Sequence, residues 1–259
     1  MNADRFLPGE LDPAVPITQQ IFVRLRGAII ECELAPGDKI SESEIARICD
    51  VSRQPVREAF IRLAGEGLLA IRPQRGTTIT PIAFSSVLDA RFLREAVEAD
   101  VVSILATDPD DEVVRELRAQ VKAQKCTPDS GHQDFLLLDD RFHRTMAEAA
   151  GKSGVWQMLD GQRAQMDRVR FLSVRRTPVA RVVAQHDAIV EQIAAGDATA
   201  ATTAMRHHLR DLLKDLHEIK AAYPDYFDLE GDDLPEPRHA PLSHRTPGTD
   251  TTHRDGPSA

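Results

Sequence analysis

Hydrophobic residues follow two different patterns along the chain, and the change from one to the other comes near residue 82. In the first part, Ile21, Leu25 and Ile29 recur at helical spacing and form an apolar stripe that ends before a Pro-Gly turn. A long first helix is therefore expected from residue 17 onwards.

Two shorter helices are expected next. Ser41 is placed to begin one of them, because a glutamate stands three residues later as in a capping box. Ser52 is placed to cap the other, in which Val56, Phe60 and Leu63 form the apolar stripe. Two short β-prone runs around a Pro-Gln-Arg-Gly turn then predict a hairpin. This order of elements predicts a winged helix-turn-helix over residues 17–82.

Residues 83–222 show helical periodicity throughout and no credible strand. The predicted fold class is mostly α, with an N-terminal winged helix-turn-helix followed by an all-α helical bundle.

The two ends of the chain differ in composition from both predicted domains. Residues 1–16 predict a flexible arm, and residues 223–259, rich in Pro, Asp, His, Thr and Gly, predict a disordered tail.

Composition narrows the class of protein. With 259 residues, 42% of them hydrophobic, the chain is long enough for two modest cores. Its three cysteines lack C-x-x-C spacing, and neither a secretory signal nor a membrane span is evident, so a cytoplasmic protein with no membrane partner is expected. The net charge of −9 does not exclude nucleic acid, because screening confines most charge effects to about 10 Å in 0.1 M salt.

The start of the third predicted helix concentrates side chains suited to DNA. In a winged helix-turn-helix the N-terminal end of the recognition helix enters the major groove, which places Arg53, Gln54 and Arg57 near base edges. Ser52 is suited to a phosphate at the helix N-terminus, and Arg75 and Gly76 stand at the wing tip. The alternative is a solvated helix face whose arginines pair with nearby glutamates, Glu58 and Glu66.

The stretch "LAPGDKISESEIARICDVSRQPVREAFIRLAGEGLLAIRPQRGTTI" resembles the DNA-binding domain of GntR-type bacterial transcription regulators. The resemblance covers nearly all of residues 17–82 and implies a homodimer on a double-stranded, palindromic operator. It also implies that Ser41, Ser43, Ser52 and Gly76 lie near the DNA backbone. The chain departs from the family at Cys49 and Asp50, where relatives often have Leu-Gly.

Polar residues interrupt three apolar stripes in the second half. Asp139 and His143 share the inward face of one predicted helix, four residues apart. His186 stands in the middle of the next stripe. In a later helix the phase of the leucines turns His208 inward and His207 outward.

Together Asp139, His143, His186 and His208 predict a site for a divalent first-row metal ion, with zinc expected first and nickel or another metal as alternatives. Burial of an unpaired carboxylate is costly, and a cation would satisfy all four residues. The alternative is ordinary core histidines that hydrogen-bond to neighbours.

The helical half resembles the FCD effector-binding domain of the FadR-like subfamily, through the segments "FLREAVEADVVSILA", "LDDRFHRTMAEAAGKSGVW" and "QHDAIVEQIAAGDATAATTAMRHHL". The resemblance implies a metal on the same four residues, a small carboxylate effector, and an effector-binding arginine at Arg94. The alternative for Arg94 is an ion pair with Glu98, one helical turn away.

The sequence is compatible with three functions. The leading hypothesis is a ligand-responsive transcription regulator and not an enzyme. The alternatives are a metal-dependent enzyme with an accessory winged helix, and a regulator that senses only the metal. No spare inward carboxylate beside the ligands, apart from Glu98, is available as a general base.

Overall fold

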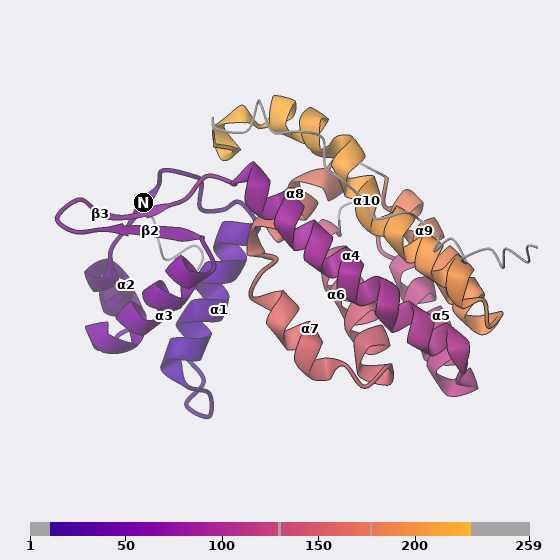
Figure 1. Cartoon of the computed structure of the whole chain (residues 1–259). Coiled ribbons are helices and arrows are strands. Elements are labelled where there is room, and N and C mark those ends of the chain that lie inside the picture. Colours follow the sequence, from indigo (N-terminus) through magenta and orange to yellow (C-terminus); the bar gives the residue numbers. More distant parts are fainter. Residues whose placement is uncertain (1–10, 129–130, 177, 229–259) are drawn as a thin grey trace, which may run out of the picture.

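The structure is a computed structural model that describes residues 11–128, 131–176 and 178–228. Figure 1 shows a small domain with a hairpin at one end and a larger bundle of helices at the other. This arrangement confirms the predicted fold class, a winged helix-turn-helix followed by an all-α bundle.

The small domain is built from three helices and a three-stranded sheet. Its apolar stripes meet in one core, which includes Ile21, Leu25, Val56 and Phe60. In chain order the elements are α1 (Ile17–Ile30), β1 (Lys39–Ile40), α2 (Glu42–Ile48), α3 (Arg53–Gly65), β2 (Leu69–Arg72) and β3 (Gly76–Ile79).

The antiparallel sheet has the order β1-β3-β2. The wing is the β2–β3 hairpin, in which Leu69 faces Ile79 and Arg72 faces Gly76. Strand β1 was not predicted from the sequence, because two residues are too few to show an alternating pattern.

In the described residues of the larger domain, the regular secondary structure is helical. The long helices α4 and α10 pack against each other (Figure 1). In chain order the elements are α4 (Phe84–Thr107), α5 (Asp111–Lys125), α6 (His132–Ala149), α7 (Ser153–Asp160), α8 (Ala164–Val174), α9 (Val179–Ala194) and α10 (Ala198–Ala222).

The first residues after α10 differ from the disordered tail that the composition predicted. A 3-10 helix spans Pro224–Tyr226, and the Ile82 amide donates to the Tyr226 carbonyl at 2.7 Å. The Asp228 amide donates back to the Ile82 carbonyl at 3.1 Å, and Phe227 is buried. One aromatic side chain therefore anchors a segment whose composition alone indicated no fold. Residues 1–10 of the predicted arm and 229–259 of the predicted tail lie outside the described residues.

Two predicted caps differ from the structure. Ser41 and Ser52 occupy the N-cap positions of α2 and α3, but neither side chain makes a capping hydrogen bond. The Ser41 hydroxyl instead lies 3.1 Å from the Ser43 hydroxyl. Spacing in the sequence fixes which residue begins a helix, whereas the hydroxyl rotamer depends on its surroundings.

Within the described part of the chain, none of the helices is long and apolar enough to cross a membrane.

Candidate nucleic-acid interface and metal centre

The first turn of α3 presents an exposed polar face. Val56 and Phe60 are fully buried, so the opposite side of the helix faces solvent. Arg53, Gln54 and Arg57 therefore point to solvent. The pattern of the sequence placed these three side chains on one accessible surface, and the structure brings them together there.

The contacts of this face are few and exposed. Arg53 Nη2 lies 3.2 Å from a carboxylate oxygen of Glu42, and the Gln54 amide donates to Glu58 at 2.9 Å. Glu66, the other partner that the solvated-face alternative names, pairs with Arg26 instead. Among the described residues, Glu58 and Glu66 therefore have partners other than Arg53 and Arg57, and Arg53 pairs with Glu42 instead.

The remaining residues expected near DNA frame this face. Ser41, Ser43 and Ser52 are exposed at the starts of α2 and α3. Arg75 and Gly76 are exposed at the turn of the wing, where Gly76 has a φ of 88°, a conformation that glycine adopts without strain.

The turn between α2 and α3 explains how the chain tolerates its departure from the family pattern. Asp50 has a φ of 51°, in the left-handed region that favours glycine. Aspartate is among the few other residues that visit this region, because its short side chain can bond locally. An aspartate can therefore occupy this turn position in place of the usual glycine.

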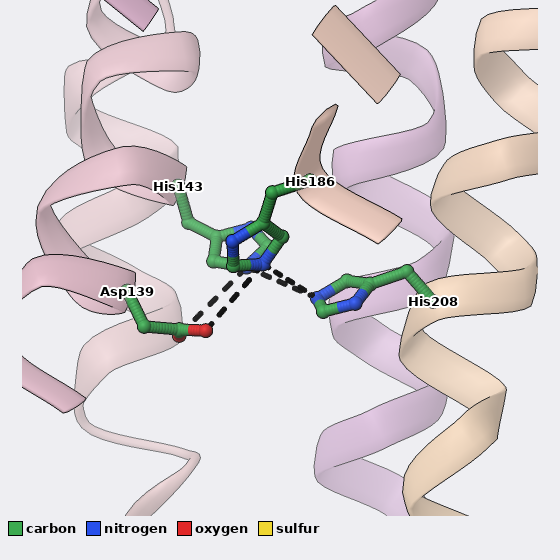
Figure 2. Close-up of side chains that lie close together, drawn as sticks. All are labelled: Asp139, His143, His186 and His208. Carbon is green, nitrogen blue, oxygen red and sulfur yellow. Dashed lines mark hydrogen bonds and ion pairs between the residues drawn. The ribbon is translucent and has the colours of Figure 1, made fainter. Parts of the chain in front are cut away.

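Three helices of the larger domain bring four polar side chains to one buried point. Figure 2 shows Asp139 and His143 from α6 facing His186 from α9 and His208 from α10. One ligand atom from each residue lies within 4.8 Å of every other. His207 is exposed, so the inward phase predicted for His208 is confirmed.

The spacing of these atoms suits a metal ion. The Nε2 atom of His208 lies 3.4 Å from that of His186 and 3.3 Å from that of His143. Asp139 oxygens lie 3.5 Å from His186 Nε2 and 3.8 Å from His143 Nε2. A tetrahedral ion with bonds of about 2.1 Å separates its ligand atoms by roughly 3.4 Å, which is close to these four distances.

Two glutamines orient the histidine rings. The Gln124 side-chain oxygen lies 2.7 Å from His186 Nδ1, and that of Gln185 lies 2.9 Å from His208 Nδ1. Each glutamine donates its amide elsewhere, Gln124 to the Leu138 carbonyl and Gln185 to a carboxylate of α10. The oxygens must therefore accept from Nδ1–H, which leaves both Nε2 lone pairs pointing at the common centre.

His143 has a different partner. Its Nδ1 atom lies 2.5 Å from Glu98, which also accepts a hydrogen bond from Arg94 Nε at 2.5 Å. Although burial opposes ionisation, Arg94 and His143 lower the pKa of Glu98, so its carboxylate stays charged. The ion pair expected as the alternative for Arg94 is thus present, and Glu98 orients a ligand, a role for which its inward position was the available signal.

Two imidazoles of the centre, His186 and His208, are held neutral. Burial lowers the pKa of His186 to about 3 and that of His208 well below its usual value. Neutral imidazole is the form that binds a metal ion, so the cluster needs no proton loss from these two groups at neutral pH.

A buried arginine completes the surroundings of Asp139. Arg170 of α8 contacts Asp139 directly and lies 3.0 Å from Asp140. Burial opposes the charge of Arg170, but Asp139, Asp140 and Asp167 raise its pKa. Asp140, the neighbour of Asp139, is half-buried because Arg163 and Arg170 both bind it.

A pocket opens beside the four residues. Arg94, Asp139, Arg170 and His208 contribute to its wall, together with apolar side chains of α6, α8 and α9 such as Phe135. Two cationic side chains and the candidate metal centre therefore share one cavity.

The pattern of the sequence did not indicate three further residues of this site: Arg170, Gln124 and Gln185. Gln124 interrupts the buried stripe of α5, the same signal that revealed the histidines. Arg170 gave no such signal, because α8 is buried on almost all sides and has no amphipathic pattern.

Comparisons with known proteins agree with this architecture. Residues 17–79 match the model for bacterial regulatory proteins of the gntR family, and residues 89–211 match the FCD domain. The chain is 34% identical over 223 residues to the HTH-type transcriptional repressor RspR of Escherichia coli, covering 85% of this chain and 98% of the relative. It is 36% identical over 222 residues to an HTH-type transcriptional regulator of Streptomyces ambofaciens, covering 85% and 94%.

Among solved structures, a GntR transcriptional regulator of Rhodococcus sp. RHA1 superposes with a TM-score of 0.62 at 25% identity, covering 80% of this chain and 98% of that one. The families and relatives are regulators of transcription, which confirms the expectation that the chain is not an enzyme.

Proposed function

Since the chain belongs to the GntR family of bacterial regulatory proteins and is a DNA-binding transcription regulator with an FCD domain, we propose that its helical domain responds to a small organic acid through a bound divalent metal ion. The single observation that carries this proposal is the convergence of Asp139, His143, His186 and His208 beside a pocket whose wall includes Arg94 and Arg170.

The DNA side of the proposal uses the exposed face of α3. Arg53, Gln54 and Arg57 contact base edges in the major groove, where an arginine fork suits guanine and a glutamine amide suits adenine. Residues at the helix starts and wing tip contact the phosphate backbone: Ser41, Ser43, Ser52, Arg75 and Gly76. The protein acts in the cytoplasm as a homodimer on a palindromic operator, since two recognition helices related by a two-fold axis require two inverted half-sites.

The metal side of the proposal rests on the donor set. Three imidazoles and one carboxylate suit zinc first, with nickel or another first-row ion as alternatives. When bound, the ion supplies a positive charge and a Lewis-acid centre to which a carboxylate oxygen can bind. Glu98, Gln124 and Gln185 fix the rings so that the Nε2 atoms are aimed before any ion enters.

The effector side of the proposal uses the pocket wall. Arg94 remains the expected effector-binding residue, although its bond to Glu98 occupies part of the guanidinium. Arg170 lines the same pocket and is a second cation for an organic acid. A guanidinium can bind a carboxylate through two parallel hydrogen bonds, which favours this class of ligand.

A regulator that senses only metal is the second candidate. The observation in its favour is that the four protein donors alone can complete a tetrahedral site, leaving no position for an effector atom.

One experiment separates the two candidates. An operator is first selected from a random pool of DNA duplexes, and the affinity of the full-length protein for it is measured with chelator, with zinc, and with zinc plus a panel of small mono-, di- and tricarboxylic acids. The proposal expects a further change of affinity with one class of acid. A response to zinc that no acid alters favours the metal sensor, and an affinity that neither zinc nor acid alters contradicts both.

A further inference from the structure

Helix α8 lies between the two domains and bonds to both. Its Gln165 side chain donates to the Gly67 carbonyl at 2.7 Å, and Arg168 donates to the Thr80 carbonyl at 2.8 Å. Gly67 follows the recognition helix and Thr80 begins the connection to α4. A shift of α8 would therefore reach the DNA-binding domain directly.

The same helix bonds to the candidate metal centre. Arg170 of α8 contacts Asp139, and its Nη1 atom lies 3.1 Å from Asp167, one turn earlier on the helix. Arg170 thus divides its charge among Asp139, Asp140 and Asp167, and Asp167 is the carboxylate that faces the other domain.

Two further ion pairs continue from Asp167 into the DNA-binding domain. Arg26 of α1 lies 3.6 Å from Asp167, and its Nε atom lies 2.7 Å from Glu66. Glu66 is the residue that ends the recognition helix α3. The five residues, named here the charge chain, alternate in sign from the metal centre to the recognition helix: Asp139, Arg170, Asp167, Arg26 and Glu66.

The charge chain is shielded from water along its whole length. The exposed fraction of its side chains lies between 5% at Asp139 and 16% at Arg26. Salt screens charges at such sites much less than it screens surface pairs. A change in the charge around one residue therefore alters the electrostatic interactions of the next residue in the charge chain. Arg170 also lines both the pocket beside the metal centre and the cleft between the domains.

We propose that the charge chain transmits the occupancy of the metal centre to the recognition helix, with Arg170 as the positioning residue at its first link. This inference rests on the proposed function, because it assumes that Asp139 binds a metal ion. It adds a physical route between the two domains.

The route follows from competition for carboxylates. When Asp139 is shared with a divalent cation it attracts Arg170 less, so Arg170 moves its charge toward its two other partners, Asp140 and Asp167. Asp167 then attracts Arg26 less, and Arg26 binds Glu66 more closely. The contact between the domains loosens, and the population of domain arrangements shifts.

The test is hydrogen exchange on the full-length protein in chelator and in zinc chloride, followed in two regions. Peptides from α6, α9 and α10 report the metal centre, and peptides spanning residues 58–71 report the end of the recognition helix and β2. In the wild type we expect zinc to slow exchange at the centre and to change exchange in residues 58–71 by about 5-fold or more, the lower end of typical coupling between sites.

Asp167→Asn cuts the charge chain in the middle. We expect this variant to keep the protection at the metal centre and to lose the remote change, with an exchange ratio near 1 in residues 58–71. Glu66→Gln cuts the last link on the other domain and should give the same result, which covers the case that Asp167→Asn does not fold. Glu191→Gln is the matched control, because it removes an exposed carboxylate that pairs with Arg118 of α5, away from the charge chain, and it should respond as the wild type does.

Different results overturn different claims. A wild type without protection at the metal centre overturns the proposed metal site and the charge chain together. Protection at the centre without a remote change, or a remote change that survives in folded Asp167→Asn and Glu66→Gln, overturns the charge chain and leaves the metal site standing.

Discussion

The arginines of α3 and those of α8 illustrate two uses of the same side chain. On α3, Arg53 and Arg57 are exposed at the start of a helix, with at most one partially buried carboxylate nearby. On α8, Arg170 is almost fully enclosed and divides its charge among three aspartates. An exposed arginine is available to an external ligand, whereas a buried one is committed to its neighbours and can respond only when one of them changes partner.

The largest effect expected from this difference follows the loss of the buried arginine. Arg170→Met leaves Asp139 buried without its cation, so in chelator the free energy of unfolding should fall by about 3 to 5 kcal/mol. Saturating zinc should reduce this cost, because the ion takes over the charge of Asp139. Urea unfolding of the wild type and of Arg170→Met, each in zinc and in chelator, measures this loss of stability.

The matched control is Arg144→Met, which removes an exposed arginine of α6 and should change the free energy of unfolding by no more than about 0.5 kcal/mol. Equal stability of the two variants in chelator would show that the network around Asp139 is not held by Arg170.

Metal binding should give the next largest effect. Zinc at about 100 times its dissociation constant should stabilise the native state by roughly 2.7 kcal/mol, because it binds the folded centre. His208→Ala removes a ligand and should abolish this gain, whereas His207→Ala, on the exposed side of α10, should keep it. Thermal unfolding in zinc and in chelator gives the comparison, and a gain that survives in His208→Ala would contradict the site.

On the exposed face the effect should appear in DNA binding and not in folding. Arg57→Ala should weaken binding to the selected operator by about 1 to 3 kcal/mol per half-site and relax discrimination at one base pair. Its free energy of unfolding should stay within about 0.5 kcal/mol of the wild type. Binding titrations with single-base operator variants test this, and an unchanged operator preference would remove Arg57 from the interface.

The smallest effect concerns Ser52. Replacing an N-cap serine that bonds to its helix typically costs about 1 kcal/mol, but the Ser52 hydroxyl makes no such bond. Ser52→Ala should therefore change stability by less than about 0.5 kcal/mol while modestly weakening DNA affinity. A full capping cost in urea unfolding would mean that the hydroxyl serves the helix in solution.

The same contrast explains what could be predicted from the sequence. The α3 face depends on local spacing, so Arg53 and Arg57 could be placed from the stripe of Val56 and Phe60 alone. Asp139 and His208 were also found, because each interrupts an apolar stripe of its own helix.

The partners of those residues could not be found in this way. Arg170 reaches Asp139 across 31 positions of sequence, from a helix that is buried on nearly all sides and shows no amphipathic pattern. Phe227 closes on Ile82 from a segment whose composition predicts disorder. Contacts of this kind are fixed by tertiary packing, which periodicity does not report.

The most direct test of the central claim is the metal content of protein purified without chelator, measured by elemental analysis for the wild type, His208→Ala and His207→Ala. The account predicts about one divalent ion per chain in the wild type and in His207→Ala, and a large loss in His208→Ala. A wild type without metal, or equal metal contents in the two histidine variants, would contradict it.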